Sequence, residues 1–401
     1  MAEQSLHGQA RRFCLRFGGA VLLALSLGGC ELVPTAPVQT ASEEPTPQPE
    51  ERAPREEPVQ PIRPATEETR HRVAVLVPIS GANAGVGQSI ANAANLALLD
   101  AGGERIRITV YDTAKSGAAA AANQALAEGN GLFLGPLLAE DVRAVALIAW
   151  RAKVPVISFS NDTSVAGDGV YLLGFTPSQS ISRVVDYASR QGLERFGALA
   201  PTGIYGGRGG EALEQATQRA GARLVGVQSF DRGPASLRTA ALRLLAAGPD
   251  AVLIADAGRT ASAAAPLLKP AGKGPRLLGT ELWAAEPDLG QTAALRGAWY
   301  ASVSDNMFNQ LRGRYRARYG SNPYRLSSLG YDAVLLAVRL AKGWKPGRPF
   351  PQDDLRDREG FTGIDGAFRF TAGGVAERSL EVREVTATGT TVVSPAARDF
   401  D

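Results

Sequence analysis

The sequence predicts an α/β fold made of two Rossmann-like lobes that face each other across a hinged cleft. From Arg72 onward, short apolar runs alternate with helical stretches, a pattern typical of a parallel sheet covered by helices. The pattern also occurs twice, at a spacing of about 120 residues. Ligands of open α/β sheets bind beyond the carboxyl ends of the strands, so two such lobes are expected to hold a ligand between them.

The first 29 residues are expected to be a lipoprotein signal peptide. Three arginines between residues 11 and 16 precede an apolar run, Phe17 to Leu27, which is too short to span a bilayer as a helix. The run ends in Leu27-Gly28-Gly29-Cys30, which resembles the lipobox of bacterial lipoproteins. We therefore expect cleavage before Cys30 and a lipid on that cysteine. The alternative is an ordinary secretory signal in which Cys30 is accidental.

Residues 30–71 are expected to form a disordered tether rich in Pro and Glu. The segment has few large apolar residues and cannot bury enough surface to offset the entropy of ordering. At roughly 3.1 Å per residue, about 40 residues reach on the order of 100 Å when extended. The other cysteine, Cys14, leaves with the signal, so no internal disulfide is available and a core must stabilise the domain.

The repeat consists of matched strands in each predicted lobe. "RVAVLVP" (Arg72 to Pro78) is echoed by "RFGALAP" (Arg195 to Pro201), and each is followed by a glycine-bearing loop and a helix. The next three matches complete the two copies: "ITVYD" with "VGVQSFD", "GLFLGP" with "AVLIAD", and "AKVPVISFS" with "GKGPRLLGT". The alternative is that all doubly wound sheets look somewhat alike.

The remaining chain is expected to close these lobes. Ser327 to Lys342 has the spacing of an amphipathic helix, and Phe361 to Phe370 with the following "SLEVREV" predicts a hairpin. We expect the folded domain to span 72–394, with 395–401 as a tail. Its expected lobes and chain crossings are as follows: lobe 1, about 72–175 plus 303–345; lobe 2, about 176–302 plus 346–394; crossings near 174–178, 303–306 and 345–350.

The composition argues against catalysis. Histidine occurs only at His7 and His71, which removes histidine-based nucleophilic catalysis and His-ligated zinc from the domain. Acids at predicted strand ends leave a paired-carboxylate glycosidase as an alternative, but such acids are commonly helix caps. We expect no catalytic residue, no metal site and no cofactor. The formal net charge of +3 comes without a basic block in the domain, so nucleic acid is not an expected partner.

The predicted strand ends carry groups suited to a small ligand. Backbone N–H groups at helix N-termini favour an anion, and hydroxyl groups after a strand add hydrogen-bond donors. An aromatic wall and an acid for an ammonium group are available in the second lobe. The alternative is that each residue is an ordinary cap. The candidate ligand-binding residues are Ser80, Gly81, Leu137, Leu138, Ser158, Ser160, Tyr205, Asp256 and Glu281.

Several stretches together resemble the type 1 periplasmic-binding fold of the leucine-binding-protein class. They include "VPISGANAGVGQSIANAANLAL", "FLGPLLAEDVRAVALIAWRAKVPVISFSN", "GLERFGALAPTGIYGGRGGEAL" and "GYDAVLLAVRLA". The resemblance implies that the loops at 135–138 and 158–160 hold a ligand carboxylate. It also implies that Tyr205 supplies the aromatic residue and that the ammonium is bound near Asp256 or Glu281. Leu137 and Leu138 stand where amino-acid receptors tend to carry Ser or Thr.

A lipid anchor, a long tether and this domain together resemble lipoproteins that activate penicillin-binding proteins. The resemblance implies a non-catalytic periplasmic regulator whose partner is a peptidoglycan synthase. Glu31 follows the lipobox in place of the aspartate linked with inner-membrane retention, which favours the outer membrane. The alternative function is a substrate-binding receptor of an ABC transporter for branched-chain or other amino acids, with an ABC permease and a small amino acid as partners.

Overall fold

The computed structural model describes residues 70–231, 233–397 and 400. The expected signal peptide, Cys30 and nearly all of the expected tether lie outside these residues. The first strand begins at His71, which pairs with Ile106, so the folded domain begins one residue before the expected boundary. No helix of the described residues is both long and apolar enough to cross a membrane.

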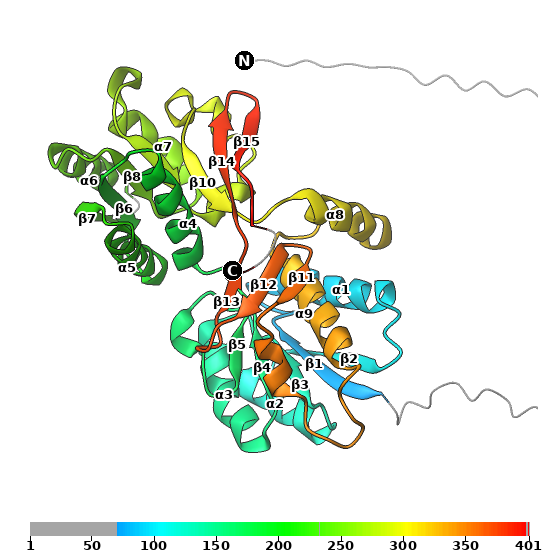
Figure 1. The fold of residues 1–401 in the computed structure, drawn as a ribbon. Helices are drawn as coiled ribbons and strands as arrows, with labels where there is room; N and C mark the ends of the chain where they lie inside the picture. Colours follow the sequence, from blue (N-terminus) through cyan, green and yellow to red (C-terminus); the bar gives the residue numbers. More distant parts are fainter. Residues whose placement is uncertain (1–69, 232, 398–399, 401) are drawn as a thin grey trace, which may run out of the picture. The chain divides into compact units, whose positions relative to one another are not determined.

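The first lobe is built on a five-stranded parallel sheet with the order β2-β1-β3-β4-β5 (Figure 1). Helices cover both faces of the sheet, and the strands inside it are largely apolar and buried, whereas the edge strand β2 is mostly only partly buried. The elements are β1 (His71–Val77), α1 (Ala84–Asp100), β2 (Ile106–Asp112), α2 (Ala118–Ala127), β3 (Leu132–Leu134), α3 (Ala139–Ala152), β4 (Val156–Ser158) and β5 (Val170–Leu172).

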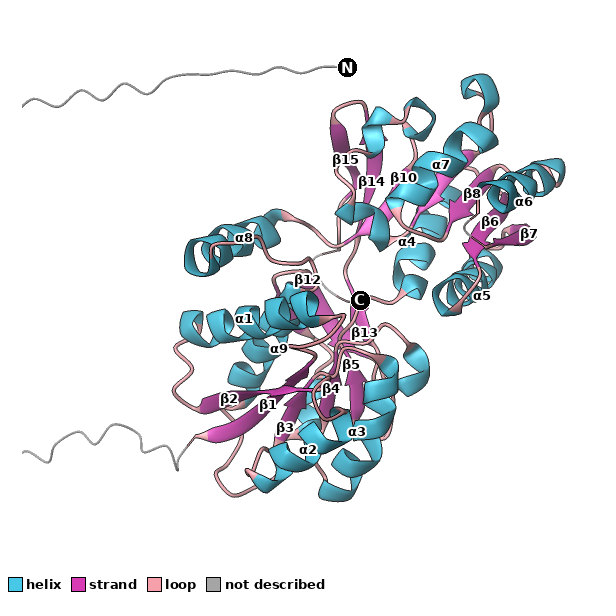
Figure 2. Ribbon diagram, turned by 180° about the vertical axis from the view of Figure 1, so that it is seen from behind, coloured by secondary structure: helices cyan, strands magenta, loops and turns pink. Residues whose placement is uncertain are grey.

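The second lobe contains a seven-stranded sheet with the order β15-β14-β10-β9-β8-β6-β7. The strands from β7 to β10 run parallel, whereas β14 and β15 form an antiparallel edge (Figure 2). The elements are α4 (Pro177–Arg190), β6 (Arg195–Pro201), α5 (Ile204–Arg219), β7 (Arg223–Phe230), α6 (Pro234–Ala246), β8 (Ala251–Ile254), α7 (Gly258–Leu268), β9 (Arg276–Gly279), β10 (Trp299–Ser302), β14 (Glu381–Thr386) and β15 (Gly389–Ser394).

The strand orders confirm the predicted fold class of two Rossmann-like lobes. The order β7-β6-β8-β9-β10 in the second sheet repeats β2-β1-β3-β4-β5 in the first. The two lobes also share a steric requirement. A Cβ on Gly87 would lie 1.9 Å from Pro78 O, and one on Gly206 would lie 1.8 Å from Pro201 O. In both lobes a glycine therefore lets the first helix begin directly against the end of its strand.

The C-terminal segment is divided between the lobes. α8 (Asn306–Tyr319) and α9 (Ser327–Leu340) pack beside α1 in the first lobe. A three-stranded sheet of β11 (Phe361–Gly363), β12 (Gly366–Phe370) and β13 (Ala376–Arg378) follows. The remaining short helices are of the 3-10 type: η2 (Thr163–Val165), η3 (Pro270–Gly272), η4 (Glu281–Ala285), η5 (Leu289–Gln291), η6 (Ala293–Leu295) and η7 (Gln352–Arg356).

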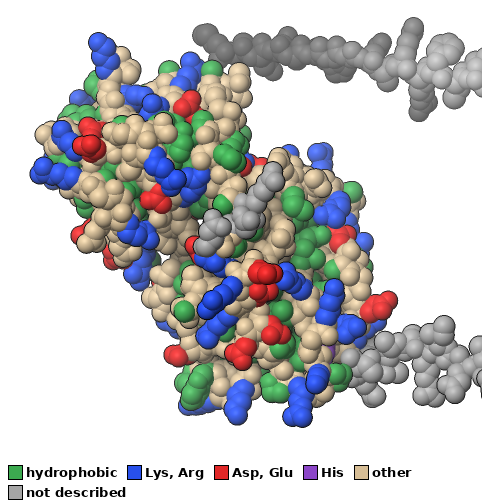
Figure 3. All heavy atoms as spheres, in the orientation of Figure 1, with side chains coloured by type: hydrophobic (Ala, Val, Ile, Leu, Met, Phe, Trp, Pro, Cys, Tyr) green, Lys and Arg blue, Asp and Glu red, His purple; other side chains and the backbone are tan. Residues whose placement is uncertain are grey.

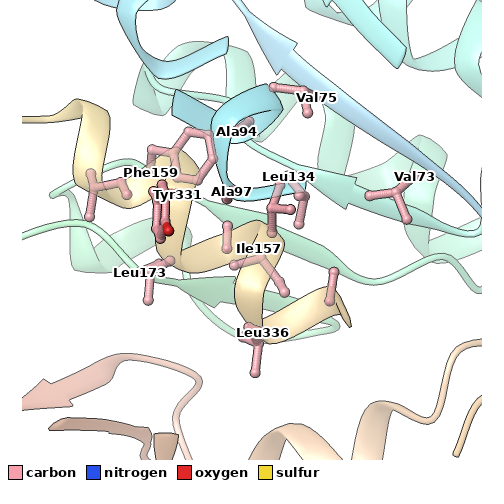
Figure 4. Packing of buried hydrophobic residues seen from close by; sticks show 14 of the residues in the cluster. Val73, Val75, Ala94, Ala97, Leu134, Ile157, Phe159, Leu173, Tyr331 and Leu336 are labelled. Atoms are coloured by element: carbon pink, nitrogen blue, oxygen red, sulfur yellow. The ribbon is translucent and has the colours of Figure 1, made fainter. Parts of the chain in front are cut away.

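The structure corrects the expected assignment of 346–394 to the second lobe. Phe361, Phe368 and Phe370 are buried in the core of the first lobe, together with residues of the first sheet and of α9. Figure 4 shows part of that core, where Tyr331 and Leu336 lie with Ile157 and Leu173. Only β14 and β15 join the second sheet, where Val382 is buried. The third crossing therefore lies between β13 and β14 and not at 345–350.

Candidate functional site

A cavity of about 430 Å³ lies where loops from the two sheets meet. Its first-lobe wall comes from the residues after β1, β3 and β4, which are the carboxyl ends of parallel strands. This is the position at which open α/β sheets bind ligands. The first-lobe residues on the wall are Asn83, Val86, Leu137, Leu138, Phe159 and Asn161.

The second lobe and the crossings complete the cavity. η4 follows β9 and supplies Glu281, Leu282, Ala284 and Ala285, and Ser302 and Val303 follow from β10. Phe175 lies at the first crossing, and Arg325 and Leu326 precede α9. Most of the wall is apolar, and its ionisable side chains are those of Arg325 and Glu281.

Three of the nine candidate residues line this cavity: Leu137, Leu138 and Glu281. Ser80 and Gly81 lie in the loop before α1 and are exposed, and the wall there is formed by Asn83 and Val86. Ser80 hydrogen-bonds to Asp112. Burial opposes ionisation of Asp112, but the bond from Ser80 and those from the Ile79 and Ala114 amides lower its pKa. Ser80 is thus occupied in holding the end of β2.

The hydroxyl groups of Ser158 and Ser160 face the protein interior. Both side chains are buried. Ser158 Oγ donates to Pro136 O at 2.9 Å and accepts from the Ser160 amide at 3.0 Å. Ser160 Oγ accepts from the Asp162 amide at 3.2 Å. These hydroxyls fix the loop after β4, and the neighbouring Phe159 and Asn161 are the residues that reach the cavity.

Glu281 and Tyr205 form an enclosed pair on the second-lobe side. Tyr205 Oη donates toward Glu281 Oε1 at 2.8 Å and lies 3.0 Å from Thr280 Oγ1. The other carboxyl oxygen, Oε2, hydrogen-bonds to Ser180. Burial raises the pKa of Glu281 against the opposing effect of these hydrogen bonds. Burial and the neighbouring Glu281 raise the pKa of Tyr205 well above its usual value.

Asp256 lies just before α7. Its Oδ1 accepts from the Ala257 amide at 2.8 Å, and its Oδ2 accepts from Thr260 Oγ1 at 3.0 Å. Asp256 is absent from the cavity wall. The structure therefore places Asp256 in holding the start of α7 and not on the cavity wall, where the ligand ammonium was expected.

Arg325 is the positively charged residue of the cavity wall, and the sequence did not indicate it. Its Nη2 lies 2.7 Å from Oδ1 of the fully buried Asp365, and its Nε lies 3.8 Å from Asp305 Oδ1. The guanidinium stacks over Phe308 at 4.2 Å from the ring centroid. The Arg325 side chain is 21% exposed, and Nη1 donates to Ser328 Oγ at 3.0 Å. No sequence pattern links Arg325 to Asp365, because the fold brings them together.

Further charged groups lie beside Arg325 at the crossings. Asp305 accepts from Arg383 at 2.6 Å, which joins the second crossing to β14. Asp332, in α9, accepts from the Ile364 amide at 2.7 Å. Burial and the nearby Asp365 raise the pKa of Asp332. The Asp305–Arg383 pair therefore holds the second crossing, whereas the Asp332 bond lies within the first lobe. On the face in Figure 3, acidic and basic side chains are interspersed over the surface.

The chemistry of the site is that of binding. Among residues 70–231, 233–397 and 400, no three His, Cys, Asp or Glu side chains are placed to hold a metal ion. The cavity wall has no Ser, Cys or Lys paired with a base in the manner of a nucleophile. Two lobes of one plan around an apolar cavity define a bilobal ligand-binding protein.

Comparison with known proteins identifies the family. The family model described as "periplasmic binding protein" matches residues 71–390. The chain therefore belongs to the periplasmic binding protein family. An uncharacterised protein of Rickettsia prowazekii (strain Madrid E) is 27% identical over 140 residues, which are 35% of this chain and 38% of that protein. The match thus spans well under half of that relative.

Two solved structures illustrate the fold. A leucine binding protein of Thermotoga maritima has a TM-score of 0.61 and 20% identity, covering 81% of this chain and 98% of its own. An ABC transporter solute binding protein of R. palustris, in complex with benzoate, has a TM-score of 0.60 and 18% identity, covering 82% and 98%. At these identities the similarity concerns the fold.

Proposed function

We propose that the protein is the solute-binding receptor of an ABC transporter, which binds a small and largely apolar ligand between its lobes. The observation that carries the proposal is the cavity of about 430 Å³ with walls from both lobes. Its volume lies within the roughly 300–1,000 Å³ of small-molecule sites, and its apolar wall with a few polar groups is typical of them. The family and the two structural relatives support a binding role.

Leu137 and Leu138 favour this proposal over the regulator expected from the sequence. On the sequence alone, their apolar character argued against an amino-acid site of the usual kind. In the structure both side chains line the cavity together with Phe159 and Val86. They form a wall that removes apolar ligand surface from water, which stabilises binding by about 25 cal/mol per Å².

A thermal-shift experiment tests the proposal. The full chain is heated with a panel of branched-chain amino acids and small organic acids, including benzoate and leucine. A ligand at about 100 times its dissociation constant stabilises the folded state by roughly 2.7 kcal/mol, which raises Tm. Crosslinking in envelope extracts then asks whether a permease and its ATPase are recovered. A panel without any shift, together with no recovered permease, contradicts the proposal.

A second candidate is the activator of a penicillin-binding protein, favoured by the lipobox at Leu27-Cys30 and the Pro/Glu-rich segment after it. A tether reaching on the order of 100 Å suits contact with a peptidoglycan synthase far from an outer-membrane anchor, and it raises effective concentration there. The same crosslinking experiment separates the two functions, because a recovered synthase without a permease supports the activator. Separation of cells into membrane and soluble fractions tests the lipid anchor. If Cys30 carries a lipid, the wild type is expected in the membrane fraction and Cys30→Ser is not.

A further inference from the structure

We infer that the cavity selects organic monocarboxylates that carry no amino group, with Arg325 as the group that holds the carboxylate. The inference rests on the receptor function proposed above and names its ligand class. An amino acid such as leucine is expected to be a poor ligand, although the structural relative from Thermotoga maritima is a leucine binding protein.

The apolar wall sets the first requirement on the ligand. Leu137, Leu138 and Phe159 face the cavity from the first lobe, and Leu282 and Val303 face it from the second. Side chains of this kind offer no partner to a polar group, and a buried polar group without a hydrogen bond costs several kcal/mol. The body of the ligand is therefore expected to be aliphatic or aromatic.

Arg325 sets the second requirement, which is a negative charge. A guanidinium remains charged at all ordinary pH values and presents five N–H donors. One donor goes to Ser328, and Nη2 is buried against Asp365, with 2.7 Å between Nη2 and Asp365 Oδ1. Asp305 and Asp365 hold the guanidinium from outside the cavity wall, since neither lines it. The Arg325 side chain is 21% exposed and lines the cavity, so a carboxylate there can accept a bond from the part of the guanidinium that remains exposed.

Glu281 does not supply the matching site for an ammonium. Its Oε1 accepts from Tyr205, and its Oε2 is bonded to Ser180. Ser180 Oγ can donate its hydrogen to Pro177 O, at 3.1 Å, and its oxygen can then accept a hydrogen bond from a protonated Glu281. The network therefore satisfies an uncharged Glu281 completely. Burial raises the pKa of Glu281, which acts in the same direction.

An ammonium group entering the cavity thus finds unfavourable surroundings. The remaining polar side chains on the wall are those of Asn83, Asn161 and Ser302, which are uncharged. An ammonium that leaves water without a carboxylate partner loses several kcal/mol of hydration. The carboxylate of the same ligand gains from Arg325. Removal of the amino group is therefore expected to improve binding.

Isothermal titration with three matched compounds tests the inference on the full chain. The compounds are 4-methylpentanoate, leucine, which adds the amino group, and 3-methylbutylamine, which lacks the carboxylate. We expect 4-methylpentanoate to bind at least about 100-fold more tightly than leucine, and the amine not to bind. Benzoate, which has an aromatic body and the same charge, is expected to bind in the range of 4-methylpentanoate.

Variants assign the charge to Arg325. Arg325→Gln leaves Asp365 buried without its partner, so the paired variant Arg325→Gln/Asp365→Asn removes both charges and guards against misfolding. Both variants are expected to bind 4-methylpentanoate at least about 100-fold more weakly than the wild type does. Arg312→Gln, an exposed arginine in α8, is the control and should change affinity less than about twofold.

The outcomes separate this inference from the receptor function. Leucine binding as tightly as 4-methylpentanoate overturns the inference and leaves the receptor standing. The same holds if the folded paired variant keeps wild-type affinity for 4-methylpentanoate. If none of the acids or amino acids binds, both the ligand class and the receptor function fail.

Discussion

Tyr205 donates its hydroxyl hydrogen toward Glu281, with 2.8 Å between Tyr205 Oη and Glu281 Oε1. The contact joins the first turn of α5 to the start of η4. Glu281, which was expected to bind a ligand ammonium, is thus hydrogen-bonded within the second lobe. Tyr205 was expected to form an aromatic wall of the site. It contacts Glu281 instead, and Glu281, not Tyr205, lines the cavity.

We predict that Glu281→Gln makes the stability of the protein less dependent on pH. Burial raises the folded-state pKa of Glu281 above its ordinary value of 4.5. The stability that comes from this shift is fully present below pH 4.5 and is lost as the pH rises through the folded-state pKa. The difference in free energy of unfolding between Glu281→Gln and the wild type, measured by urea denaturation, should therefore shift in favour of Glu281→Gln as the pH rises from 5 to 8.

Glu214→Gln makes the same chemical change at an exposed position of α5 and serves as the matched control. A Glu281→Gln variant that loses stability relative to the wild type as the pH rises would show that the carboxyl is held as a carboxylate. That result would reopen Glu281 as an ammonium partner.

Asp256→Ala is predicted to lower the free energy of unfolding by about 1 kcal/mol, the usual effect of losing a hydrogen bond. The carboxylate accepts from the Ala257 amide and from the Thr260 hydroxyl at the start of α7. Asp256→Asn retains one acceptor oxygen and should lose less. Neither change is expected to alter ligand affinity, as measured by titration. A loss of affinity at unchanged stability would restore Asp256 to the ligand site.

Leu137→Ala and Leu138→Ala are each predicted to lower the affinity for an apolar ligand by roughly tenfold. Each change removes apolar contact area, worth about 0.8 kcal/mol per buried methylene. Both side chains are only partly buried, so the loss of stability should be smaller than for a core leucine. Titration calorimetry gives the affinity, and unchanged affinity in both variants would place the ligand elsewhere.

Gly206→Ala is predicted to cost about 3 kcal/mol or to prevent folding, because the new Cβ would lie 1.8 Å from Pro201 O. The adjacent Gly207 has no atom within 4 Å of an added Cβ. Gly207→Ala is therefore the control, and it should be neutral or stabilising by up to about 1 kcal/mol. Equal effects of the two changes, measured by urea denaturation, would contradict the close approach of α5 to β6.

The repeated strands could be predicted because a strand buried on both faces must be apolar along its whole length. Arg72 to Pro78 and Arg195 to Pro201 carry this pattern in the sequence. The alternation in Phe361 to Phe370 predicts a strand with one buried face, but it does not say which core receives that face. The assignment of this hairpin to the second lobe was wrong for that reason.

The site could be predicted less completely. The loops after β3 and β4 follow from the rule that ligands bind at the carboxyl ends of strands, and Leu137 and Leu138 do line the cavity. The orientation of Ser158 depends on Pro136 O, which belongs to another loop. Arg325 depends on Asp365 and Phe308, which reach it only through the tertiary fold. Local patterns carry no information about such contacts.

The most direct test of the ligand-binding cavity is a thermal-shift titration of the full chain against the double variant Leu137→Ala/Leu138→Ala. Small organic acids and branched-chain amino acids are titrated over the same concentration range. The account predicts that at least one organic acid raises Tm of the wild type with concentration, and that the shift largely disappears in the double variant. No concentration-dependent shift from any compound, or an equal shift in both proteins, would contradict it.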